Sequence, residues 1–107
     1  MSRGGDFLLK TQNDIFQILR DQKSSLLEGY QVTKIGVFGS YARGEQTNES
    51  DLDILVDYQD DRPPTLPKLI ELRDYLSELL TIKVDVVTPN GLKARLRDRV
   101  LSEVIYL

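Results

Sequence analysis

The stretch that most constrains how this chain can fold runs from Ile35 to Tyr58 and reads IGVFGSYARGEQTNESDLDILVDY. Two short apolar runs are joined by a polar connection, residues 41–50, and the second run carries Asp51 and Asp53 two positions apart. Short runs rich in β-branched and aromatic residues predict buried strands. A tight turn and two acids are therefore expected at strand ends.

Gly39-Ser40 forms the predicted turn after the first strand. Glycine lets the chain turn tightly and lets its backbone approach a ligand, and Ser40 can cap the short helical turn that residues 41–43 would make. Backbone N–H groups at such a turn can hold a phosphate. Taken alone, Gly39-Ser40 fits a purely structural turn equally well.

Asp51 and Asp53 are expected on one strand face about 7 Å apart, with Leu52, Ile54 and Val56 on the other face. Two carboxylates at one strand end repel each other unless a cation lies between them. Mg²⁺ takes oxygen ligands and completes its octahedron with waters and substrate phosphates, so few protein carboxylates suffice. Asp51 alone would fit better as a solubilising charge at a strand edge.

Asp85 is the third candidate acid and lies between Val84 and Val86 in an apolar run, residues 82–87. An unpaired carboxylate on a covered strand face costs several kcal/mol, so this acid needs a partner or a role. If its strand lies beside the strand of Asp51 and Asp53, all three acids converge. Taken together, these residues favour a metal and nucleotide site over a purely structural turn and a solubilising surface charge.

Two further charged features have competing interpretations. Arg43 could neutralise a triphosphate oxygen, or it could pair with Glu45 or Glu49. Asp57 lies at the far end of its strand and is interpreted as a solvated acid. The cations near the C-terminus, Lys93, Arg95, Arg97 and Arg99, are typical of a solvated helix face, although they could also meet an ATP tail or a partner protein.

Gly39-Ser40, ten intervening residues, Asp51-x-Asp53 and the later Asp85 together resemble the motif of the nucleotidyltransferase superfamily that includes DNA polymerase β. The short chain and the segments GSYARGE and SDLDILVD resemble the minimal nucleotidyltransferases within it. Those proteins are encoded beside HEPN-domain partners in prokaryotic toxin–antitoxin pairs. The resemblance covers Lys34 to about Leu107.

The resemblance implies Mg²⁺-dependent transfer of AMP from ATP to a hydroxyl. Asp51 and Asp53 would bind the metal ions, and Gly39 and Ser40 would hold the β- and γ-phosphates. Asp85 would bind a second metal ion and help to deprotonate the acceptor. For minimal nucleotidyltransferases the implied acceptor is a tyrosine of the HEPN toxin, which AMPylation silences. The alternative is a non-catalytic antitoxin that binds and masks its partner.

Composition limits the other possibilities. A length of 107 residues predicts a single domain, with residues 1–10 as a disordered start, and leaves the acceptor site to another molecule. The net charge of -3 gives no overall attraction for nucleic acid, and the absence of cysteine and histidine excludes thiol and imidazole catalysis. No signal peptide or membrane span is evident, so a cytoplasmic protein is expected. Assembly with itself or with the partner is left open.

The apolar pattern along the whole chain predicts an α/β fold, in which helices pack on a small mixed sheet. Apolar spacing predicts helices over residues 14–28, 66–80 and 92–107, the first capped by Thr11 or Asn13 and ended by Gly29. Strands are predicted over residues 31–38, 51–57 and 81–88, and the polar segments 44–50 and 59–65 are predicted loops.

Overall fold

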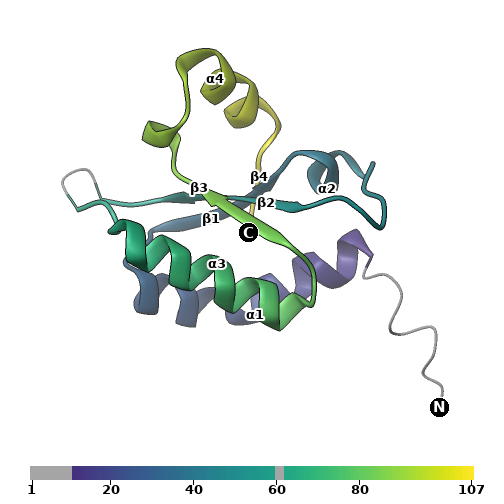
Figure 1. Cartoon of the computed structure of the whole chain (residues 1–107), viewed down its shortest axis with the longest axis horizontal. Coiled ribbons are helices and arrows are strands. Elements are labelled where there is room, and N and C mark those ends of the chain that lie inside the picture. The colour runs from purple at the N-terminus through teal and green to yellow at the C-terminus, as the bar shows by residue number, and fades with distance from the viewer. Residues whose placement is uncertain (1–10, 60–61) are drawn as a thin grey trace.

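The computed structural model describes residues 11–59 and 62–107, and the predicted disordered start at residues 1–10 lies outside this range. A single mixed sheet of four strands has helices on both of its faces, which confirms the predicted fold class (Figure 1). The strand order is β3-β2-β1-β4; β2 and β3 are parallel, and β1 is antiparallel to both β2 and β4. The strands are β1 Lys34–Phe38, β2 Leu52–Asp57, β3 Val84–Val87 and β4 Ile105–Tyr106.

Helices α1 (Gln12–Tyr30) and α3 (Leu66–Leu80) cover one face of the sheet (Figure 1). Thr11 caps α1 through a capping box with Asp14, as one of the two predicted caps. Gly29 does not end α1, contrary to prediction: the helix continues to Tyr30, and Gln31 adopts the left-handed conformation that stops it. None of the described helices is both long and apolar enough to cross a bilayer.

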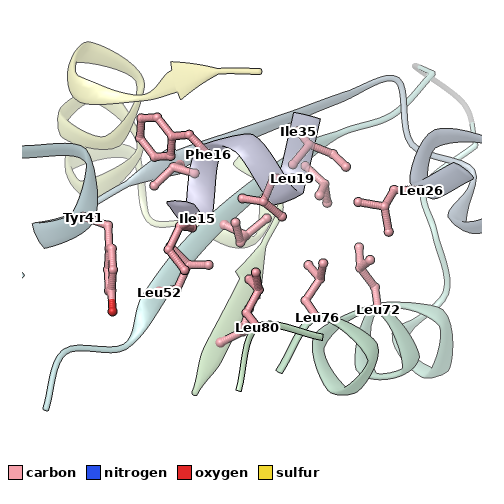
Figure 2. Close-up of a cluster of buried hydrophobic side chains, with 14 of the residues drawn as sticks. Ile15, Phe16, Leu19, Leu26, Ile35, Tyr41, Leu52, Leu72, Leu76 and Leu80 are labelled. Carbon is pink, nitrogen blue, oxygen red and sulfur yellow. The ribbon is translucent and has the colours of Figure 1, made fainter. Parts of the chain in front are cut away.

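The hydrophobic core lies between this helix pair and the sheet (Figure 2). Each element contributes the side chains that its apolar period predicts, since every third or fourth residue of a helix and every second residue of a strand share a face. The buried members include Ile15, Phe16, Leu19, Leu26, Ile35, Val37, Tyr41, Leu52, Ile54, Val56, Leu72, Leu76, Leu80 and Val84.

The predicted C-terminal helix is too long at both ends. Residues Pro89–Gly91 form a 3-10 turn, α4 spans only Ala94–Glu103, and the chain then extends into β4. β-branched and aromatic residues at 104–106 favour a strand, and the open edge of β1 supplies the pairing partner, which local helical spacing cannot reveal. The prediction of this helix rested on Leu92, Leu96, Val100 and Val104, which are spaced four apart. Leu96 does not share a buried face with Val100, because it is 48% exposed.

Two of the three predicted strands, residues 31–38 and 81–88, are too long at their N-terminal ends. Gln31 and Thr81 both have left-handed backbones that end the preceding helices, so neither can begin a strand. The strands begin at Lys34 in β1 and at Val84 in β3.

Gly36 lets the C-terminal segment cross closely over β1. A Cβ atom at this position would lie 2.6 Å from Val104 Cγ2, 3.0 Å from Tyr106 Cδ1 and 3.3 Å from the carbonyl oxygen of Ile105. The register of β4, with Gly36 opposite Tyr106, therefore depends on the absence of a side chain here.

We expect Gly36→Ala to lower the free energy of unfolding by about 1–3 kcal/mol, because an added methyl group overpacks this crossing. Gly29→Ala is the matched control: its Cβ would contact nothing, and alanine favours a helix by up to about 1 kcal/mol. Urea unfolding measures both changes. Equal stability of Gly36→Ala and the unmodified chain would show that the crossing is not tight.

Candidate active site

Antiparallel pairing of β1 and β2 brings the Gly39 turn against Asp53. Phe38, the last residue of β1, pairs with Asp53, so the chain leaves the sheet at the level of this carboxylate. Gly39 has φ 75°, and a Cβ there would collide with Asp53 Oδ2 and lie 3.2 Å from Asp53 Cγ. Glycine is required both for its backbone conformation and for this contact.

The turn continues directly into the short helix α2 (Ser40–Arg43). Gly39 and not Ser40 is its N-cap residue, which corrects the predicted cap: the Gly39 carbonyl accepts from the N–H groups of Ala42 at 3.0 Å and Arg43 at 3.1 Å. Ser40 is the first helical residue. Its backbone N–H and its hydroxyl have no hydrogen-bond partner among the described residues, so both can bind a ligand.

Two contacts hold α2 on the body of the protein. Tyr41 is buried in the hydrophobic core (Figure 2), and burial raises the pKa of its hydroxyl. From α1, the Gln12 side chain donates to the Tyr41 carbonyl at 2.6 Å. The hydrophobic core and α1 therefore both fix the position of the turn.

Asp53 and Asp85 lie on the face of the sheet away from the core. Asp53 and Asp85 pair in register across the parallel strands β2 and β3, and paired residues in neighbouring strands point to the same side. Val84 is buried in the core, so Asp85 points to the opposite face, as predicted from strand alternation. Asp51 precedes β2, two residues from Asp53.

These acids form an open set of oxygen donors. Asp51 and Asp85 are exposed and Asp53 is partly buried. Within residues 11–59 and 62–107, no group of three or more acidic, histidine or cysteine side chains is close enough to hold a metal ion by itself. A cation here would need oxygen ligands from elsewhere, and the predicted set of three metal ligands stays a prediction.

The charges around Asp53 favour its neutral form. Burial, followed by the negative charges of Asp85, Asp51 and Glu103, raises the pKa of Asp53 to about 6, and Arg43 acts in the opposite direction. The site therefore concentrates negative charge that the described residues do not fully balance.

Arg43 lies at the end of α2 and makes two ion pairs. Its Nε donates to Glu45 at 2.9 Å and its Nη1 to Glu103 at 3.1 Å; these hydrogen bonds, the one to Glu45 first, raise the pKa of the guanidinium. The pair with Glu45 is one of the two alternatives that the sequence left open. Arg43 Nη2 has no partner among the described residues.

Glu103 is the site residue that sequence reasoning missed. Besides pairing with Arg43, its Oε2 accepts from the backbone N–H of Gly39 at 2.7 Å. Nothing in the local sequence marks Glu103, because its position depends on the end of α4 and on the pairing of β4 with β1.

Two comparisons with known sequences indicate the same kind of domain. A family model described as the nucleotidyltransferase domain matches residues 19–107. The protein adenylyltransferase MntA of Thermococcus cleftensis is 46% identical over 97 residues, which cover 91% of this chain and 96% of that protein.

Solved structures share the fold. A chain provisionally named a minimal nucleotidyltransferase superposes with a TM-score of 0.71 at 38% identity, covering 87% of this chain and 95% of that one. A toxin–antitoxin crystal structure with AMP-PNP has a chain that superposes with a TM-score of 0.68 at 27% identity, covering 80% and 69%.

The raised pKa of Asp53 predicts a pH-dependent stability gain in Asp53→Asn. In the unmodified chain the folded state keeps the Asp53 proton up to about pH 6, whereas the unfolded chain loses it near pH 3.8, so stability is lost as pH rises through this window. We expect Asp53→Asn, without divalent cations, to be more stable by about 1 kcal/mol above pH 6 after solvent screening, with the gain vanishing below pH 4.

Urea unfolding between pH 4 and 8 measures this difference. Asp57→Asn is the control on the same strand face, because Asp57 lies at the other end of β2 from Asp51 and Asp85. A gain for Asp53→Asn that does not change with pH would contradict the raised pKa of Asp53.

Proposed function

Because the chain belongs to the nucleotidyltransferase family, we propose that it transfers AMP from ATP to a hydroxyl group of a partner protein and thereby acts as an antitoxin. The proposed acceptor is a tyrosine of a HEPN-domain toxin. A relative that is named a protein adenylyltransferase and a fold neighbour solved as a toxin–antitoxin with AMP-PNP support this proposal.

The observation that carries the proposal is the contact between the Gly39 turn and the Asp53 carboxylate, with Asp85 on the same face and Asp51 two residues before Asp53. A nucleotide bound at the turn would have its phosphates beside these acids. Such an arrangement suits phosphoryl transfer, in which positioning and charge stabilisation supply most of the rate enhancement.

The triphosphate would bind along the turn. Gly39 permits close approach of the backbone, and Ser40 offers its N–H and its hydroxyl as donors. Arg43 can present Nη2 to a phosphate oxygen while Nε and Nη1 keep their carboxylate partners. These three residues are the proposed nucleotide-binding set.

Asp51, Asp53 and Asp85 fit a divalent cation, because the set contains only carboxylate oxygens and crowds like charges that a cation would relieve. We assign Mg²⁺ to these residues, two ions being expected, held jointly with the triphosphate. A bound ion would supply positive charge to the phosphates as the leaving group departs.

One of these acids would also accept the proton of the acceptor hydroxyl. The tyrosine oxygen forms a bond to the α-phosphorus while the bond to the bridging oxygen of the β-phosphate breaks, so AMP is transferred and pyrophosphate leaves. Asp85, the exposed acid on β3, is assigned as the group that takes up the hydroxyl proton.

The acceptor has to come from outside this fold. The four strands and the helices form one core, and the described elements that surround the acids belong to that core or to α4. Asp51 and Asp85 are exposed, so a side chain of another molecule can reach them.

Incubation with labelled ATP, MgCl₂ and a HEPN-domain toxin tests the function. Label on a tyrosine, located by mass spectrometry and lost with Asp51→Asn/Asp53→Asn, is the expected result. The non-catalytic alternative requires stoichiometric silencing of the partner without label, by the unmodified chain and the double variant alike.

Asp85→Asn should separate binding from transfer. Asp51 and Asp53 remain beside the turn in this variant, so we expect the affinity for the Mg²⁺ complex of AMP-PNP to stay within about threefold while the transfer rate falls at least about a hundredfold. Calorimetry and a single-turnover assay measure the two quantities. Unchanged transfer would remove Asp85 from the reaction.

Mg²⁺ and nucleotide should bind cooperatively, because the acids alone make no closed metal site and phosphate oxygens can complete it. We expect AMP-PNP to bind at least about tenfold more tightly with MgCl₂ than with EDTA, as measured by calorimetry on the isolated chain. Equal affinities would contradict the joint site, and the Asp51→Asn/Asp53→Asn variant is the control that should lose the coupling.

A further inference from the structure

Glu103 connects the C-terminal helix to the nucleotide turn. It is the last residue of α4, and its two oxygens serve two groups of the turn: Oε2 accepts from the Gly39 N–H at 2.7 Å, and both oxygens lie within hydrogen-bond distance of Arg43 Nη1, at 3.1 and 3.2 Å. We infer that Glu103 is a positioning residue that holds the Gly39–Arg43 turn in its nucleotide-binding form. The catalytic part of this inference rests on the proposed function.

Simple attachment of the C-terminal segment does not require these contacts. β4 pairs with β1 at Gly36 and Val37, the Leu107 N–H donates to the Ile35 carbonyl at 3.0 Å, and Val100 is buried on α4. The segment is therefore fixed by backbone pairing and packing. Glu103 adds a connection to the turn itself.

The hydrogen bond from the Gly39 N–H to Glu103 is stronger than a hydrogen bond between neutral groups. A carboxylate that accepts from a backbone N–H makes a charge-assisted hydrogen bond, and the Glu103 side chain is only 21% exposed, so water competes weakly for it. The side chains of the Arg43–Glu45 ion pair are 39% and 66% exposed, and exposed pairs of this kind contribute little to stability. Glu103 is accordingly the main restraint on the Gly39 peptide outside β1 and α2.

Fixing the Gly39 peptide also fixes the groups that follow it. The Ser40 N–H and hydroxyl have no hydrogen-bond partner among the described residues, and the Arg43 guanidinium is held at Nε and Nη1 with Nη2 remaining for a ligand. A nucleotide that meets an ordered turn does not have to supply the free energy of ordering it. Glu103 should therefore lower the concentration of nucleotide needed and affect the chemical step little.

Two variants test the role of the hydrogen bond. Glu103→Ala removes both contacts, whereas Glu103→Gln keeps a carbonyl oxygen that can accept from the Gly39 N–H. We expect KM for ATP to rise about tenfold in Glu103→Ala with kcat within about threefold, and Glu103→Gln to restore KM to within about threefold of the unmodified chain. Asp98→Ala, an exposed acid on the same helix, is the matched control and should change neither constant.

A measurement on the free protein keeps this inference separate from the proposed activity. Exchange of the Gly39 amide hydrogen, followed by NMR, should be slow in the unmodified chain and in Glu103→Gln and faster at least about tenfold in Glu103→Ala. Calorimetry with AMP-PNP and MgCl₂ should rank the affinities in the same order. If these results hold while no variant transfers AMP, the positioning role stands and the proposed catalysis fails.

Three outcomes would overturn the positioning role. The first is an unchanged Gly39 exchange rate in a folded Glu103→Ala. The second is equal impairment of Glu103→Gln and Glu103→Ala. The third is tighter nucleotide binding by Glu103→Ala, which would show that the carboxylate competes with phosphate at the turn.

Discussion

The antiparallel register of β1 and β2 is the constraint on which the rest of this molecule depends. It sets Phe38 opposite Asp53, so the chain turns at Gly39 beside a carboxylate, where only a residue without a side chain fits. A shift of the register by one residue would reverse the faces of all β2 side chains: Leu52, Ile54 and Val56 would leave the core. Core packing and the site are thus specified by the same pairing.

Elements with a strong local period were predictable from the sequence. The Leu72, Leu76 and Leu80 stripe of α3 and the alternation in β2 each match one geometric period, and the Gly39 turn follows from its glycine and the apolar run before it. The placement of Asp85 on the face of Asp53 also followed from alternation between valines.

The C-terminal end of the fold could not be predicted in the same way. Ile105–Tyr106 forms a strand because β1 has an open edge beside it, and that edge is a property of the assembled sheet. Glu103 was missed for the same reason: its contact with Gly39 joins residues 64 positions apart and depends on where α4 ends. Local sequence patterns carry no information about such a contact.

Pairing in β4 extends over two residues, which makes it the shortest strand of the sheet. Short edge segments open at a lower free energy than the whole domain, and they do so as local units. Because only Val104 lies between Glu103 and this segment, and the Glu103 carboxylate holds the Gly39 N–H, we expect opening of the sheet edge to favour release of the Gly39 N–H. The conformational freedom of the turn is thus linked to fluctuations of the opposite end of the chain, and a molecule that clamps or displaces this edge changes the turn without touching it.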